Sequence, residues 1–343
     1  MAASSEPAPV GLRGTSHALG ATMAILITGG AGFIGSATAV SLLQRGDDVV
    51  LLDAFQPLLY DRATKERNLA WVRQHGEPVF IEGDLRDEAL LGELFERHRI
   101  EGVIHLAALA GVRHSIELPD LYADINITAT ARLMRVAMGA GVRRFALASS
   151  SSVYAMNTRT PFREDDHLPG QVSPYGASKF AMEALVQTLH HLADPAIDVA
   201  ALRYFTVYGP RQRPDMAFHK FFTRLAAGQP IPMFGDGDSG RDYTFIDDIV
   251  AGTIAALDRV RGYRVYNLGG EEVHRLREVI QTMGEVAGVT PQIERLPMQA
   301  GDVFITSADV ARARDELGYA PTTPLRDGLE KMWVWFQQER ATD

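Results

Sequence analysis

Three glycines at a spacing of three, Gly29, Gly32 and Gly35, lie in the segment TGGAGFIGS at residues 28–36. Glycine weakens the interiors of helices and strands, so such a cluster indicates a special backbone conformation. The apolar run MAILIT before it predicts a buried strand, and FIGSATAVSLLQRG after it has apolar residues at helical spacing. A strand, a glycine turn and a helix in this order predict a dinucleotide-binding turn, with a plain packing turn as the alternative.

The turn also predicts which backbone groups contact the dinucleotide. We expect Gly29 to form the tight turn, Gly32 to let the backbone approach a pyrophosphate, and Gly35 to let helix and strand pack closely. Phe33 and Ile34 are the first residues of the expected helix. Its N-terminus presents free N–H groups and the positive end of the helix dipole to the phosphates.

The strands that follow end in residues suited to the rest of a dinucleotide. DDVVLLD ends at Asp53, about 20 residues after the glycines, where a carboxylate accepts hydrogen bonds from ribose hydroxyls. Because that carboxylate would repel a 2′-phosphate, NAD is favoured over NADP; a loop-opening acid is the alternative. Two further strand ends complete the predicted cofactor site. PVFIEGD ends with Asp84, which is expected with Leu85 near the adenine. EGVIHLAAL ends in the small apolar residues Leu106, Ala107 and Ala108, which would let the cofactor approach closely.

Composition excludes several classes of function. The 343 residues contain no cysteine, which removes disulfides, thiolate catalysis and cysteine metal ligands. The net charge of −9 argues against nucleic acid or an acidic membrane surface as a partner. No apolar run approaches the roughly 18 residues of a membrane span. We therefore expect a cytoplasmic protein without a metal site, preceded by a disordered tail at residues 1–22 that lacks signal-peptide features.

Strand and helix patterns alternate from residue 24 to about residue 204, which predicts an α/β fold, a Rossmann-type doubly wound parallel sheet. Helices are expected at 33–45, 61–75, 87–98, 117–140 and 173–193. Strands are expected at 24–28, 48–52, 78–82, 102–106, 144–148 and 197–203. We assign residues 23–204 to this domain, with 243–268 returning to its sheet, and 205–242 and 269–343 to a smaller, mostly helical substrate domain.

Two segments carry the residues expected to do chemistry. SPYGASKF places Tyr175 and Lys179 four apart on one face of a predicted helix. An ammonium near a phenol lowers the phenol's pKa and makes it a general base, although a solvated pair is the alternative. FALASSSSVY ends a strand in the serines 149–152, at the sheet edge where ligands bind in open α/β sheets. A serine there can hydrogen-bond a substrate oxygen, with a polar loop as the alternative.

The combination of glycine turn, acid after the second strand, serine run and Tyr/Lys pair resembles the extended short-chain dehydrogenase/reductase superfamily, from Met23 over nearly the whole chain. The resemblance implies that Tyr175 is the general base, that Lys179 holds the nicotinamide ribose and lowers the phenol's pKa, and that Ser150 assists. It places two further residues at the cofactor, Asn126 in YADINITAT and Phe205.

The residues after Ser150 favour one reaction within that superfamily. Nucleotide-sugar dehydratases carry an Asp-Glu pair here and UDP-glucuronate decarboxylases a glutamate, whereas this chain has Ser151 and Ser152. Simple C4 epimerisation is therefore favoured over elimination.

The segment LRYFTVYGPRQRPDMAF resembles UDP-glucuronate 4-epimerases, since UDP-galactose 4-epimerases carry asparagine in place of Thr206. A guanidinium pairs bidentately with a carboxylate, so Thr206 and Arg213, helped by Ser151 or Ser152, are expected to hold a C6 carboxylate. The alternative is that Arg213 pairs with Asp215 or caps the next helix.

The same resemblance supplies residues for the nucleotide half of a UDP-sugar. Arg241 in GRDYTFIDD resembles the diphosphate-binding arginine, and Asp302 in AGDV the acceptor of the uridine ribose. Gln299 stands where galactose-type enzymes have a second arginine. Phe234 is expected to line the uracil pocket, with a core position as the alternative. Arg113 in AALAGVRHSIELPDLY is a further expected substrate contact.

Together these matches imply reversible interconversion of UDP-glucuronate and UDP-galacturonate. Tyr175 would take the O4 proton while a hydride leaves C4 for tightly bound NAD, and the hydride would return to the opposite face of the 4-keto sugar. A UDP-glucose or UDP-xylose 4-epimerase and a non-catalytic NAD-binding protein are the alternatives. The resemblance also implies a homodimer, with no nucleic-acid or membrane partner.

Overall fold

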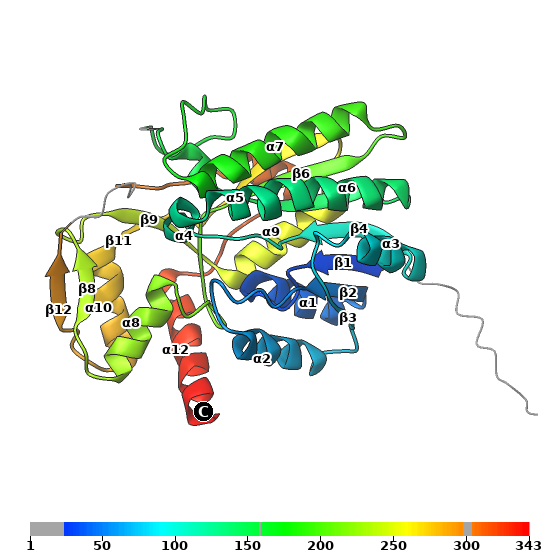
Figure 1. Ribbon diagram of the computed structural model, residues 1–343. Helices are drawn as coiled ribbons and strands as arrows, with labels where there is room; N and C mark the ends of the chain where they lie inside the picture. The colour runs from blue at the N-terminus through cyan, green and yellow to red at the C-terminus, as the bar shows by residue number, and fades with distance from the viewer. Residues whose placement is uncertain (1–23, 158, 298–303, 343) are drawn as a thin grey trace, which may run out of the picture.

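A computed structural model describes residues 24–157, 159–297 and 304–342. Its centre is a seven-stranded parallel sheet in the order β10-β6-β5-β4-β1-β2-β3 (Figure 1). The order reverses beside β1, and ligands bind at the carboxyl ends of strands at such a point. The strands are β1 Ala24–Thr28, β2 Asp48–Asp53, β3 Val79–Glu82, β4 Ile100–His105, β5 Arg144–Ser150, β6 Asp198–Tyr204 and β10 Tyr263–Leu268.

Helices cover both faces of this sheet, which confirms the predicted Rossmann-type fold. Successive strand residues point to opposite faces. Ile25 and Ile27 of β1 therefore join one core, while Leu26 joins the other. The first core packs against α1 Phe33–Arg45, α2 Arg62–Arg73 and α9 Ile246–Arg259. The second packs against α3 Glu88–Arg97, α6 Ala129–Gly139 and α7 Pro174–Leu192, with α6 and α7 above the sheet in Figure 1.

The single helix expected at 117–140 is wrong in detail. The chain instead forms α4 Val112–Glu117, α5 Pro119–Ala123 and a π-helical turn, η1 Asp124–Thr128, before α6. Pro119 lacks a backbone N–H and disfavours helical geometry at the preceding residue, and Leu118 has φ −130° and ψ 51°. The break separates two short helices where periodicity indicated one long helix.

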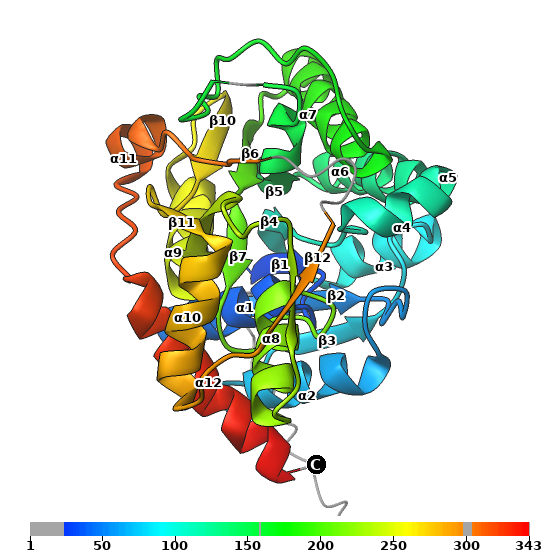
Figure 2. The same ribbon diagram turned by 90° about the vertical axis from the view of Figure 1, so that its left-hand side faces the viewer.

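The elements outside the main sheet lie beside the carboxyl ends of its strands (Figure 2). They contain two small sheets as well as helices, so this part is less helical than expected. Strands β7 Thr206–Tyr208, β9 Gly240–Phe245 and β11 Val273–Arg275 form one sheet, and β8 Ile231–Phe234 pairs with β12 Ile293–Leu296. The helices are α8 Ala217–Ala226, α10 Leu276–Ala287, α11 Ala311–Leu317 and α12 Leu325–Thr342.

One hydrophobic core continues from the main sheet into these elements, since Ile27 of β1, Phe222 of α8 and Met332 of α12 belong to the same cluster. As expected, β10 returns to the main sheet beside β6. The proposed tail at 1–22 lies outside the described residues, so the division into a tail and two domains stays a prediction. Among the described helices, none is long and apolar enough to cross a membrane.

Candidate active site

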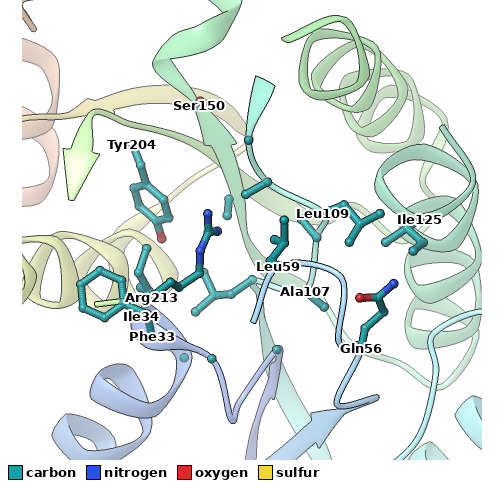
Figure 3. A pocket seen from close by; sticks show the side chains of 18 of the residues that line it. Phe33, Ile34, Gln56, Leu59, Ala107, Leu109, Ile125, Ser150, Tyr204 and Arg213 are labelled. Atoms are coloured by element: carbon teal, nitrogen blue, oxygen red, sulfur yellow. The ribbon is translucent and has the colours of Figure 1, made fainter. Parts of the chain in front are cut away.

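A cavity of about 420 Å³ opens at the carboxyl ends of the central strands (Figure 3). Its wall joins the glycine turn, the end of β2, the serines after β5, the start of α7 and the loop after β7. Most of the residues expected at the cofactor and the sugar line it, namely Gly29, Gly32, Phe33, Ile34, Gly35, Asp53, Asp84, Leu85, Leu106, Ala107, Ala108, Ser150, Ser151, Ser152, Tyr175, Lys179, Phe205, Thr206 and Arg213.

The glycine turn is packed so tightly that side chains do not fit. Gly29 has φ +71°, and a Cβ there would lie 2.8 Å from the backbone nitrogen of Ala107. A Cβ on Gly35 would lie 2.1 Å from the carbonyl oxygen of Gly29. Helix α1 has no side-chain cap at Gly32 and no acid in its first turn. This backbone-lined, uncapped helix N-terminus fits a pyrophosphate.

Asp53 is buried at the end of β2 and is held by the turn itself. Its Oδ2 accepts from the Ala31 N–H at 3.1 Å, and its Oδ1 accepts from the Phe55 N–H at 2.8 Å. Helix α2 adds two contacts that we did not predict. Lys65 Nζ lies 3.3 Å from Asp53 Oδ1, and Asn68 Nδ2 donates to the Ala31 carbonyl oxygen at 3.1 Å. Their only signal in the sequence is a spacing of three on one predicted helix.

The part of the cavity predicted to hold the adenine has polar side chains on one side and small side chains on the other. Asp84 accepts from the Arg86 backbone N–H at 2.9 Å and from its guanidinium Nη2 at 2.7 Å. The side-chain hydrogen bond from Arg86 is the main cause of a lowered pKa at Asp84. Ala107 follows β4 and packs against Gly29, so this strand end is close to the glycine turn.

Asn126 lies behind the cavity wall and contacts a residue that lines it, and its place at the cofactor stays a prediction. Its side chain is buried and bonds both the N–H and the carbonyl oxygen of Leu109, each at 2.9 Å. Its Nδ2 also donates to Ser178 Oγ at 2.9 Å. Asn126 sits in the π-helical turn η1, so it ties that turn to the loop after β4 and to α7. These hydrogen bonds hold the loop after β4, which lines the cavity, in position.

The start of α7 presents Tyr175 to the cavity. Ser173 is the N-cap and accepts from the Gly176 N–H at 3.1 Å, and Pro174 occupies the first helical position. The Tyr175 ring contacts Tyr122 edge-on, with ring centroids 6.2 Å apart. Tyr175, Lys179 and Ser150 line the same cavity, so the structure brings the three expected catalytic residues together.

The electrostatics of this group depend on burial and on several charged or polar neighbours. Burial raises the pKa of Tyr175, while the hydrogen bond with Ser150 and the positive charge of Arg213 lower it. Burial lowers the pKa of Lys179 to about 8, and the charge of Glu183 opposes that shift. Lys179 Nζ donates to the Ala148 carbonyl oxygen at 2.7 Å. Arg213 is thus a cation that lowers the pKa of Tyr175, and the role expected for Lys179 stays a prediction.

A buried ion pair that we did not predict lies one turn beyond Lys179. Glu183 accepts from Arg203 Nη2 at 2.7 Å and from its Nε at 3.0 Å, and both side chains are 5% exposed. Ser149 Oγ donates to the same carboxylate. Lys179 and Glu183 thus bond to neighbouring residues of β5, which fixes α7 against the strand that ends in the serines.

The predicted sugar end contains Ser151, Ser152, Thr206 and Arg213. Figure 3 shows the Arg213 side chain projecting into the cavity. Its Nε and Nη2 donate to the two carboxylate oxygens of Asp215, each at 2.9 Å. The pairing that we named as the alternative for Arg213 is therefore present, in a place that also faces the cavity.

Some expected substrate residues lie away from the cavity formed by the described part of the chain. Arg113 is exposed on α4, and Phe234 ends β8. Arg241 on β9 donates from Nη1 to the carbonyl oxygens of Gly240 at 2.9 Å and of Phe304 at 3.2 Å. Gln299 and Asp302 fall outside the described residues. Within those that the structure describes, no cluster of side chains suits a metal ion. Lining residues that we missed include Gln56, Leu59, Tyr60, Lys65 and Met216.

Residues 25–269 match the NAD dependent epimerase/dehydratase family. A UDP-glucuronate 4-epimerase of Thermodesulfobacterium geofontis is 38% identical over 314 residues, 91% of this chain and 96% of that protein.

Two solved structures extend the comparison. UDP-glucuronic acid 4-epimerase from Bacillus cereus, in complex with UDP-glucuronic acid and NAD, is 36% identical with a TM-score of 0.85, over 92% of this chain and 100% of that one. UDP-glucose 4-epimerase from Thermotoga maritima, with UDP-glucose, is 29% identical with a TM-score of 0.84, over 93% and 100%. The chain belongs to the NAD-dependent epimerase/dehydratase family.

Proposed function

We propose that this protein is an NAD-dependent epimerase that interconverts UDP-glucuronate and UDP-galacturonate by inverting C4. The observation that carries the proposal is one cavity holding a glycine-turn dinucleotide site, the Tyr175 phenol and the Arg213 guanidinium. The UDP-glucuronate 4-epimerases of T. geofontis and B. cereus, similar over more than nine-tenths of the chain, support the same substrate.

The cofactor would be held by the residues that line the deeper cavity. The backbone of Gly29, Gly32, Phe33, Ile34 and Gly35 meets the pyrophosphate. Asp53 would hydrogen-bond a ribose of NAD. The rest of NAD would contact Asp84, Leu85, Leu106, Ala107, Ala108 and Phe205, and Asn126 lies behind these residues. Bound NAD supplies the acceptor and donor of a hydride at C4 of the sugar.

Tyr175 is the proposed base for the O4 proton. Its phenol is buried, which raises its pKa, so a phenolate there needs stabilising neighbours. Ser150 supplies a hydrogen bond and Arg213 a positive charge, while Lys179 lines the same wall. A general base so placed contributes roughly 10²–10⁴-fold to the rate.

Arg213 and Thr206, with Ser151 or Ser152, are the proposed recognition residues for the C6 carboxylate. Asp215 fixes the plane of the guanidinium through Nε and Nη2. A 4-keto uronate is a β-keto acid, which loses CO₂ when its carboxylate turns out of the ketone plane. A two-point clamp on the carboxylate opposes that rotation. Serines 151 and 152 also provide no acid for an elimination, which favours simple epimerisation.

The nucleotide half of the substrate is proposed to contact Arg113, Phe234, Arg241, Gln299 and Asp302, as the family resemblance implies. A homodimer is also proposed, because α4 and α7 pack together and expose apolar side chains, Ile116 at 63% and Phe180 at 41%. Sedimentation equilibrium tests it. Cytoplasmic location is supported by the absence of cysteine and is tested by cell fractionation.

The decisive experiment incubates the purified protein with UDP-glucuronate without added cofactor and identifies the product. Formation of UDP-galacturonate supports the proposal, whereas no conversion in protein shown to contain NAD contradicts it. A neutral-sugar epimerase is the second candidate, because Asp215 already occupies two donors of Arg213. Comparing kcat/KM on UDP-glucuronate, UDP-glucose and UDP-xylose separates the two, since a clamp for the carboxylate predicts a clear preference for the uronate.

A further inference from the structure

A buried lysine faces the acid that was expected to select the cofactor. Lys65 and Asp53 have side chains that are 10% and 5% exposed, and their charged atoms lie 3.3 Å apart. Both line the cavity. Lys65 Nζ also lies 5.2 Å from the centre of the Tyr60 ring. The ammonium is therefore fixed at the cavity wall rather than extended into solvent.

Two charged residues close to Lys65 in the sequence have partners of their own. Arg62 lies over the Phe55 ring but donates to Glu66 and Glu82. Asp61 caps α2 by accepting from the Thr64 N–H. Asp53 itself accepts from two backbone N–H groups, which hold both of its oxygens in place.

This arrangement changes the charge that a dinucleotide meets at the end of β2. An unpaired carboxylate at that point carries one negative charge and repels a 2′-phosphate. The Lys65–Asp53 pair is neutral as a whole, and its cationic member is a hydrogen-bond donor that suits a hydroxyl or a phosphate oxygen.

We propose that Lys65 is a second cofactor-specificity residue, whose ammonium offsets Asp53 and weakens the exclusion of NADP below what the acid alone would impose. The inference rests on the cofactor site proposed above and is independent of which sugar the protein accepts. It predicts an order for the ratio of NADP affinity to NAD affinity: Lys65→Met lowest, wild type intermediate, Asp53→Asn highest.

The variants isolate charge from shape. Lys65→Met keeps a long unbranched side chain in the wall and removes the ammonium. Asp53→Asn keeps the shape of the side chain and one of the two acceptor oxygens, and leaves the ammonium without a carboxylate partner. Lys220→Met on α8 is the matched control, because that lysine is exposed and lies outside the cavity-lining set. If Lys65→Met fails to fold, Lys65→Gln serves the same purpose.

The test measures the nucleotide and not turnover. Each full-length protein is stripped of nucleotide with charcoal and titrated calorimetrically with NAD and with NADP. Removing one hydrogen-bonding charge should lower the NADP-to-NAD affinity ratio roughly 10-fold or more in Lys65→Met, with Lys220→Met unchanged. Because both affinities come from one preparation, a loss of stability cancels from the ratio.

Two outcomes overturn the inference in distinguishable ways. A ratio in Lys65→Met within twofold of the wild type, with both nucleotides bound, refutes the role of Lys65 and leaves the proposed function intact. Failure of the wild-type protein to bind either nucleotide removes the cofactor site itself, and the proposed function falls with it.

Discussion

Replacing Gly35 with alanine tests whether the glycine turn is limited by backbone contact. The added Cβ would lie 2.1 Å from the Gly29 carbonyl oxygen, 2.9 Å from its carbonyl carbon and 3.0 Å from the Gly30 Cα. These atoms belong to the backbone, so no side chain can rotate away. The helix must move from β1, or the turn must open, and either change displaces the N–H groups proposed to meet a pyrophosphate.

The size of the effect follows from two opposing terms. Alanine stabilises a helix interior by about 1 kcal/mol relative to glycine, which is an upper value for Gly35 in the first turn of α1. Overpacking costs typically 1–3 kcal/mol and more where the neighbours cannot yield, so about 3 kcal/mol is reasonable here. The net loss is about 2 kcal/mol. At roughly 2.1 cal/mol/K per residue, 343 residues give an unfolding entropy near 0.7 kcal/mol/K, so Tm should fall by about 3 °C.

Gly92→Ala provides a matched control. Gly92 also lies inside a helix, α3, and a Cβ there would meet nothing within 4 Å. The same substitution should therefore raise Tm by about 1 °C and leave bound NAD unchanged. The assay is the amount of NAD released per chain from each purified protein, followed by Tm with and without saturating NAD. Because a ligand that binds only the folded state raises Tm, comparing Tm with and without NAD separates a loss of NAD affinity from a loss of stability.

The reasoning would be refuted by a Gly35→Ala protein that keeps both the wild-type NAD content and the wild-type Tm. An equal fall of NAD content and Tm in Gly35→Ala and Gly92→Ala would also contradict it, because only Gly35→Ala places a Cβ against backbone atoms.

Two further predictions concern the site, and a third concerns the buried His105, which contacts Thr28 and Thr130. Tyr175→Phe should lower kcat by roughly 10²–10⁴-fold while NAD content stays unchanged, and Tyr266→Phe, on β10, should do neither; activity within twofold of the wild type would exclude Tyr175 as the base. Arg213→Ala should lower kcat on both sugars, because the Arg213 charge lowers the pKa of Tyr175, and should in addition raise KM for UDP-glucuronate and release a decarboxylated product detectable by mass. The neighbouring Arg211→Ala variant should stay near normal, and equal losses of kcat/KM on both sugars would mean that Arg213 does not bind the carboxylate. Burial lowers the pKa of His105 to about 3, so the unfolded chain takes up a proton below pH 6.5 that the folded protein refuses, and stability falls as pH drops from 6.5 toward 3. Between pH 7 and pH 5 the wild type should lose about 2 kcal/mol more than His105→Gln in urea unfolding, and parallel losses would refute this.

The sequence predicted the features that depend on local order. The strand before Gly29, the uncapped helix after it and the acid ending β2 are all encoded within one βαβ unit, and the structure forms them within two residues of the expected bounds. The same holds for the start of α7, where Ser173 and Pro174 define the N-terminus. Helix and strand periodicity suffices for such elements because each is decided by neighbours along the chain.

Contacts between distant segments were not predictable in the same way. Lys65 reaches Asp53 across 12 positions, and Arg203 reaches Glu183 across 20, with no spacing rule that links them. An exposed ion pair and a buried one look alike in a sequence, because burial depends on which elements pack together. The sequence identified Asp53, but it did not show that the positive charge of Lys65 lies beside this carboxylate.

Tyr175 and Lys179 show that a motif determines the spacing of two side chains but not the direction of each. A spacing of four places two side chains on one helix face, but it does not decide where a flexible ammonium is directed. Here the Ala148 carbonyl oxygen at the end of β5 accepts from Lys179 at 2.7 Å, so that charge turns toward the strand. Arg213, 38 residues beyond Tyr175, supplies the positive charge that lowers the phenol's pKa. A residue expected to bind the substrate carboxylate thus also acts on the base, so its substitution should change kcat as well as KM.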